Sequence, residues 1–142
     1  MNRYQDSKQS HSQCVVCGDA KQNPLSLQCK FFADGDNQVV GYHKVSPQLQ
    51  GYNSFLHGGV ASALVDAAMT HCLLMQGIKA LTAEMTIRFV APIKVGDAIK
   101  IVGRLVIQRL GMYQLEAALY VDNKAFVTAS AKFIQPKSGV IG

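Results

Sequence analysis

The sequence has no long apolar run and only four cysteines. None of its apolar stretches approaches the ~20 residues that a membrane-spanning helix needs, and the first thirteen residues lack the apolar core of a signal peptide. We therefore expect no membrane segment and a cytoplasmic location. In an intracellular chain the four cysteines are expected to be free thiols; they are Cys14, Cys17, Cys29 and Cys72.

Signals for nucleic-acid binding are also missing. The chain has no helix-turn-helix signature, no aromatic-rich RNA-binding motif and no dense basic run, so we expect no nucleic-acid partner. The formal net charge is +5, and residues 79–109 carry six basic and two acidic residues. This excess favours a small anionic ligand, such as one that bears phosphates.

The 142 residues are enough for one domain with a single core, predicted over residues 14–138, with a frayed tail at 1–13 and a short tail at 139–142. Periodicity and turn residues predict strands near 25–33, 38–45, 82–90, 98–108, 112–121 and 124–135, and a helix over 57–75. Short turns between consecutive strands indicate an antiparallel sheet, so the fold class is α+β with the sheet curled around the helix.

The predicted helix is apolar on nearly every side. Between residues 60 and 75 only Ser62, Asp66, Thr70 and His71 are not apolar, so the helix is expected inside the protein. Burial of an unpaired carboxylate is costly, which makes Asp66 a candidate for function. The structural alternative is that Thr70 or Ser62, one turn away on the same face, caps that carboxylate.

The start of this helix offers a second functional feature. Two glycines there leave backbone N–H groups free to face a ligand, and the helix dipole adds positive potential. Gly59 and Asp66 lie seven residues apart, roughly 10 Å along a helix axis, so one reacting carbonyl cannot contact both in the same helix. If the two groups act together, two antiparallel helices related by a two-fold axis must supply them, which predicts at least a dimer.

A possible metal site precedes the first strand. Cys14 and Cys17 form a C-x-x-C-G motif, and together with Cys29 and His11 they offer a Cys3His ligand set for zinc. There is no second close cysteine pair, and His11 lies in the predicted tail. The sequence therefore favours a turn with two semi-buried thiols and no bound metal.

Three motifs stand in a characteristic order along the chain. They are C-x-x-C-G followed by Asn-Pro-Leu, then Q-G-Y-x-x-x-L-H-G-G-V-x-x-x-L-x-D, and then T-A-x-M-x-I-x-F-x-x-P-x-x-x-G-D. Together they resemble the PaaI-like acyl-CoA thioesterases of the hotdog fold, over residues 14–135. The resemblance implies a curved antiparallel sheet of about six strands wrapped around one long central helix, and no cofactor.

The resemblance also implies roles for individual residues. The backbone amide of Gly58 would be the oxyanion-hole donor, and His57 would orient that turn, unless it only caps the helix. Asp66 of the partner subunit would be the nucleophile or the general base, and Thr82, unless it is only a strand residue, would position water or the carboxylate. The candidate substrate-binding residues are Gly59, Asn53, Tyr52, Phe55 and Ser62, and the candidates for the CoA phosphates are Lys94, Arg88, Arg104 and Arg109.

One departure from the family pattern concerns the segment before the helix. Where some members carry an asparagine six residues before the histidine, this chain has Gly51, with Asn53 two residues later. An asparagine-assisted step is therefore not expected in this chain.

The implied activity is hydrolysis of a small- or medium-chain, or aryl, acyl-CoA to the free acid and CoA. The resemblance implies a homodimer with active sites at the subunit interface, and a dimer of dimers as the larger assembly. Two alternatives remain open at this stage: a β-hydroxyacyl dehydratase of the same fold, and a non-catalytic acyl-CoA-binding protein.

Overall fold

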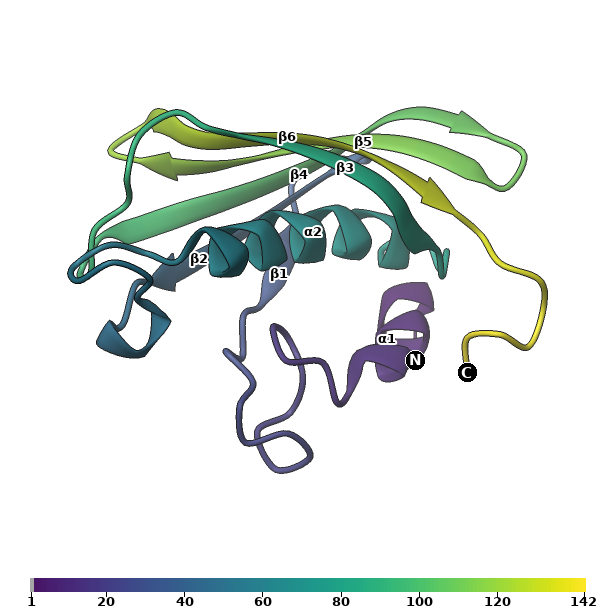
Figure 1. Cartoon of the computed structure of the whole chain (residues 1–142). Coiled ribbons are helices and arrows are strands. Elements are labelled where there is room, and N and C mark those ends of the chain that lie inside the picture. Colours follow the sequence, from purple (N-terminus) through teal and green to yellow (C-terminus); the bar gives the residue numbers. More distant parts are fainter. Residues whose placement is uncertain (1) are drawn as a thin grey trace.

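Six antiparallel strands form one sheet, and one long helix lies across its concave face (Figure 1). The computed structural model describes residues 2–142. The sheet order is β1-β2-β4-β5-β6-β3. This arrangement confirms the expected α+β fold class; the strands are β1 (Phe31–Ala33), β2 (Gln38–Lys44), β3 (Leu81–Phe89), β4 (Ala98–Arg109), β5 (Met112–Val121) and β6 (Lys124–Ile134), and the long helix is α2 (Gly58–Leu74).

Helix α2 forms the centre of the core. The side chains of Leu64, Val65 and Met69 are completely buried between the helix and the sheet. The sheet approaches the helix most closely at Gly103 of β4, where a Cβ atom would lie 2.7 Å from the backbone of Ala68. The prediction of an apolar helix enclosed by strands is therefore confirmed.

The first strand is shorter than the sequence predicts. We expected a strand over residues 25–33, whereas β1 begins at Phe31. The backbone N–H groups of Leu27 and Cys29 donate instead to the carbonyl oxygens of Val15 and Val16, each at 2.9 Å. Gln28 between them has a φ of 53°, so the backbone cannot continue as a regular strand there.

The expectation of a frayed tail over residues 1–13 is wrong for the described residues 2–13. A helix, α1 (Arg3–Lys8), and a 3-10 turn, η1 (Gln9–His11), pack beneath the C-terminal end of α2 (Figure 1). Asn2 forms a capping box with Gln5 at the helix start. Ser7 is buried, and its hydroxyl donates to the carbonyl oxygen of Leu74 at 2.6 Å. Tertiary contacts therefore order a segment whose composition alone predicts disorder.

A second 3-10 turn, η2 (Pro47–Leu49), lies in the irregular segment that leads into α2. Within residues 2–142, no helix is both long enough and apolar enough to span a lipid bilayer.

Candidate active site

His57 caps the start of α2. Its Nδ1 accepts a hydrogen bond from the backbone N–H of Gly59 at 2.8 Å, and the backbone N–H of His57 donates to the carbonyl oxygen of Leu49 at 2.8 Å. A Cβ at Gly59 would lie 2.9 Å from Nδ1, and one at Gly51 would lie 3.2 Å from the His57 Cα. Both glycines thus make room for the imidazole, which explains why Gly51 carries no side chain.

The amide of Gly58 is left free by this arrangement. Gly58 is the first residue of α2, and its N–H has no acceptor among residues 2–142. Such an N–H lies at the positive end of the helix dipole. A Cβ at Gly58 would lie 3.6 Å from the ring of Phe89, so the residue sits beside that aromatic side chain. The position is suited to a donor for a carbonyl oxygen or an oxyanion.

An apolar cleft of about 290 Å³ adjoins Gly58. Its walls come from the segment before α2, from α2 itself and from the end of β3, and include Leu56, Ala61, Phe89, Val90, Pro92 and Ile93. We did not predict any of these residues as a site residue. The available signal was the F-x-x-P motif, which places two apolar residues at a strand end close to the helix start. The cleft suits a small apolar group next to the free amide.

Asp66 lies farther along α2, half-buried, with one side-chain partner. Its Oδ1 accepts a hydrogen bond from the hydroxyl of Thr82 at 2.5 Å. Burial raises the pKa of the carboxyl, and the hydrogen bond from Thr82 partly opposes that shift. Thr70 donates instead to the backbone carbonyl of Asp66 at 2.9 Å, and Ser62 to that of Gly58 at 2.8 Å. The alternative in which Thr70 or Ser62 caps the carboxylate is therefore wrong.

A β-bulge accompanies Thr82. In the pairing of β3 with β6, Thr82 is opposite Phe133, and Glu84 is opposite the next residue, Lys132, so one extra residue stands in β3. Bulges re-aim side chains and often accompany functional sites. Here the bulge lies next to the threonine whose hydroxyl reaches across to α2.

None of the remaining candidates for substrate binding lines the cleft. Tyr52, Asn53 and Phe55 belong to the surface loop before α2, and the side chain of Tyr52 is 90% exposed. The N–H of Gly59 already donates to His57. In one chain, the structure thus brings together Asp66 with Thr82, and His57 with Gly58 and Gly59, as two separate groups.

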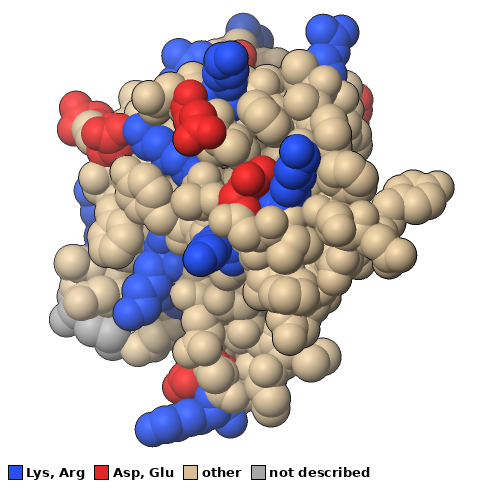
Figure 2. Space-filling model, turned by 90° about the vertical axis from the view of Figure 1, so that its left-hand side faces the viewer, with Lys and Arg blue, Asp and Glu red and all other residues tan. Residues whose placement is uncertain are grey.

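The basic residues proposed for CoA phosphates are spread over the surface. Figure 2 shows Lys and Arg side chains scattered over one face of the molecule, with Asp and Glu side chains among them. Arg104 forms an ion pair with Glu116 at 2.6 Å, in which both side chains are about half exposed. Lys94, Arg88 and Arg109 are exposed without a side-chain ion pair in the described chain.

His71 packs inside the protein, as expected, rather than at the candidate site. The residue is 1% exposed, and its ring stacks on Phe31 with the centroids 4.6 Å apart. Its Nδ1 lies 2.8 Å from the hydroxyl of Tyr4, and its Nε2 has no hydrogen-bond partner within the described part of the chain. Burial lowers the pKa of this imidazole to about 3, so the ring is neutral at pH 7.

This burial predicts a pH-dependent stability. The unfolded chain binds a proton at the ordinary His pKa of 6.5, whereas folded His71 binds one only near pH 3. The free energy of unfolding should therefore fall as the pH decreases from 6.5, by up to about 1.4 kcal/mol per pH unit from this group. Urea unfolding between pH 6.5 and 5 measures the slope, and His71→Gln should flatten it. An unchanged slope in that variant would show that His71 does not cause it.

Comparison with known proteins shows which proteins this chain is similar to in sequence and in fold. Residues 53–112 match the model of the thioesterase superfamily. The Escherichia coli PaaI protein from the phenylacetic acid degradation operon superposes with a TM-score of 0.78 at 19% identity, over 93% of this chain and 97% of that one. A hypothetical thioesterase from Streptococcus pneumoniae, solved with coenzyme A, superposes with a TM-score of 0.71 at 20% identity, over 75% of this chain and 86% of that one.

A third solved structure, of another thioesterase superfamily protein, gives a TM-score of 0.78 at 21% identity over 84% of this chain, which spans 62% of that protein's length. These structural similarities establish the fold. The segment matched by the family model, residues 53–112, contains the start of α2, Asp66 and Thr82. The chain therefore has the hotdog fold of these proteins, and its central segment is similar to the thioesterase superfamily.

Proposed function

We propose that this protein is an acyl-CoA thioesterase, which hydrolyses a small- or medium-chain, or aryl, acyl-CoA to the free acid and CoA. The observation that carries the proposal is the half-buried Asp66 carboxylate, whose one side-chain partner is the hydroxyl of Thr82. The free amide of Gly58 beside an apolar cleft supports it, as does the match of residues 53–112 to the thioesterase superfamily model, which favours a thioester hydrolase.

In the proposed reaction the thioester carbonyl oxygen accepts a hydrogen bond from the N–H of Gly58. Water attacks the carbonyl carbon while the Asp66 carboxylate takes its proton, and the negative charge moves to the oxygen held by Gly58. The tetrahedral intermediate then collapses, the C–S bond breaks, and the CoA sulfur leaves and takes up the proton that Asp66 accepted from water. Thr82 holds the carboxylate in place through its hydroxyl. Direct attack by Asp66 on the carbonyl, followed by hydrolysis of the resulting anhydride, uses the same groups.

The two groups are proposed to come from different subunits. Gly58 and Asp66 are eight residues apart in α2, about 12 Å along the axis, and the cleft beside Gly58 is lined by neither Asp66 nor Thr82. Strand β3 occupies one edge of the sheet and exposes Leu81 and Phe89 by 51% and 55%. A homodimer that covers this edge and pairs two antiparallel α2 helices brings Gly58 of each chain to Asp66 of the other. A dimer of dimers is the proposed larger assembly.

Features of the similar proteins support the choice of substrate and residues. The Streptococcus pneumoniae protein was solved with coenzyme A. Two further structures of it are variants in which an aspartate and, sixteen positions later, a threonine are replaced by alanine. The same separation joins Asp66 and Thr82 in this chain. In the proposed complex, Lys94, Arg88 and Arg109 are candidates to meet the CoA phosphates.

The proposal is tested by thiol release from a panel of acyl-CoA thioesters of increasing chain length, together with aryl acyl-CoAs. We expect turnover with a preference for acyl groups small enough for the cleft of about 290 Å³. The matching oxygen esters serve as a control for non-specific hydrolysis. Absence of thiol release from every thioester would contradict the proposal. Hydration of an enoyl-CoA without thiol release would point instead to the dehydratase alternative.

A further inference from the structure

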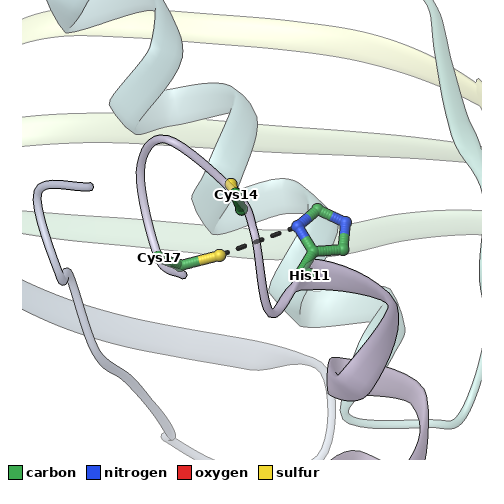
Figure 3. A group of neighbouring side chains, drawn as sticks. All are labelled: His11, Cys14 and Cys17. Atoms are coloured by element: carbon green, nitrogen blue, oxygen red, sulfur yellow. Dashed lines mark hydrogen bonds between the residues drawn. The ribbon is translucent and has the colours of Figure 1, made fainter. Parts of the chain in front are cut away.

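Three potential metal ligands lie close together in the segment that follows helix α1. One ligand atom from each of His11, Cys14 and Cys17 lies within 4.8 Å of the other two (Figure 3). The Sγ of Cys17 is 3.6 Å from the Nδ1 of His11. A zinc ion bound to sulfur at about 2.3 Å and to nitrogen at about 2.0–2.1 Å, at the tetrahedral angle, holds those two atoms about 3.6 Å apart. Cys17 and His11 thus already have the spacing of two ligands of one zinc ion, and Cys14 lies within 4.8 Å of both.

The backbone around the two cysteines supports thiolate ligands. The N–H of Val16 donates to the Sγ of Cys14 at 3.4 Å, and the N–H of Gly18 donates to the carbonyl oxygen of Cys14 at 2.8 Å. A Cβ at Gly18 would lie 2.5 Å from the backbone N of Cys14, so only glycine permits this tight turn. Backbone donors directed at sulfur stabilise the charged form that binds metal.

His11 is held in position. It ends the turn η1, and its carbonyl oxygen accepts from the N–H of Cys14 at 3.0 Å. The following chain is fixed as well, because the N–H of Asp19 donates to the carbonyl of Ser12 at 2.8 Å. The sequence argument against this ligand, that it lies in a frayed tail, therefore no longer applies.

The group also has access to solvent. His11 and Cys17 line a cleft of about 430 Å³, together with Gln5, Lys8 and Asp19 among others. A fourth ligand position that faces this cleft has room for a water molecule.

We propose that His11, Cys14 and Cys17 bind one Zn²⁺ per chain, with the fourth tetrahedral position facing this cleft. The bound ion joins η1 to the C-x-x-C turn and so holds the N-terminal segment in place. None of the three ligands is a residue of the candidate active site, although His11 and Cys14 act electrostatically on the Asp66 carboxyl. The proposed metal site does not depend on the proposed thioesterase activity. Because three protein ligands bind one ion, the affinity depends on each of them, whereas the other cysteines are not required.

The test is metal binding by the full chain, stripped by a chelator and kept reduced. We expect one bound Zn²⁺ per chain by elemental analysis after desalting, and a higher thermal midpoint with the metal. Cobalt in place of zinc should give thiolate-to-cobalt charge-transfer absorption. Cys14→Ser, Cys17→Ser and His11→Ala should each weaken binding by at least about tenfold, since loss of an outer-shell partner alone costs 10–100-fold.

Cys72→Ser is the matched control. Cys72 is buried, and its Sγ donates to the carbonyl oxygen of Asn37 at 3.1 Å, away from the three ligands, so serine can keep that bond and metal binding should be unchanged. Cys29→Ser should also retain binding. Loss of the metal in Cys29→Ser would overturn the three-residue assignment. Absence of the cobalt charge-transfer band in the unmodified chain, or full binding by Cys14→Ser, would overturn the site itself.

Discussion

Replacement of Asp66 by asparagine is expected to lower the kcat for thioester hydrolysis by about 10²–10⁴-fold, the usual contribution of a positioned general base. In the unmodified protein the carboxylate accepts a hydrogen bond from the Thr82 hydroxyl at 2.5 Å. Asparagine keeps an acceptor for that hydroxyl, but it cannot take a proton from water. Because the change removes a group that acts in the transition state, KM should change much less than kcat. Steady-state thiol release over a range of acyl-CoA concentrations separates the two constants.

The same variant should be more stable than the unmodified protein at neutral pH. Burial raises the pKa of Asp66 above the ordinary value of 3.8, so the folded state disfavours the charged form. A raised folded pKa contributes stability below pH 3.8, and this contribution is lost as the pH rises through the folded pKa. Asparagine carries no charge, so the thermal midpoint of Asp66→Asn should exceed that of the unmodified chain at pH 7, and the difference should shrink near pH 4.

A control separates this effect from a general one of acid removal. Asp36 is exposed in the turn between β1 and β2, so Asp36→Asn should change neither kcat nor the thermal midpoint appreciably. If Asp66→Asn gains stability but keeps its activity, Asp66 is a buried structural carboxylate. If it loses both activity and stability, the carboxylate is needed for the fold, and the lost activity does not assign proton transfer to Asp66.

Composition and periodicity were sufficient for the elements that form the core. Helix α2 follows from an apolar run of good helix formers between a glycine pair and Gln76-Gly77, and the meander of β4, β5 and β6 follows from alternation between short turns. Asp66 could be singled out because it is the one carboxylate in that helix. A buried charge among apolar residues is a local signal, and it does not require knowledge of the tertiary structure.

Other features depend on tertiary contacts that no local pattern reports. Helix α1 has six residues, too short to be stable alone, and it is held by Tyr4 and Ser7 against α2. The hydroxyls of Ser62 and Thr70 lie on the same face as Asp66, yet both prefer backbone carbonyl oxygens of their own helix. Their sequence spacing predicts proximity to the carboxylate but not the atom to which they donate.

Replacement of Gly58 by proline is expected to lower kcat by about 10²–10³-fold, the usual cost of losing one oxyanion-hole donor. Proline removes the backbone N–H, and the helix tolerates it because Gly58 is the first helical residue. His57 before it has φ −62° and ψ 133°, which a following proline accepts. The thermal midpoint should therefore change little, and kcat measured by thiol release tests the role of the amide.

Gly58→Ala is the matched control for this variant. It keeps the N–H, and its Cβ would lie 3.6 Å from the Phe89 ring, an ordinary van der Waals contact. We expect Gly58→Ala to retain most of the activity. Equal losses in Gly58→Ala and Gly58→Pro would indicate that space at this position, and not the hydrogen-bond donor, is what the reaction needs.

Mixing the two inactive proteins tests whether a site is shared between subunits. In a dimer of one Asp66→Asn chain and one Gly58→Pro chain, the first chain supplies an intact Gly58 and the second an intact Asp66, so one of the two shared sites is complete. If chains exchange randomly, half of the dimers are mixed, and activity should return to about a quarter of the unmodified level. If both groups of a site come from one chain, every site lacks one group and no activity returns. Recovered activity after refolding the mixture, compared with each variant refolded alone, therefore decides between the two arrangements.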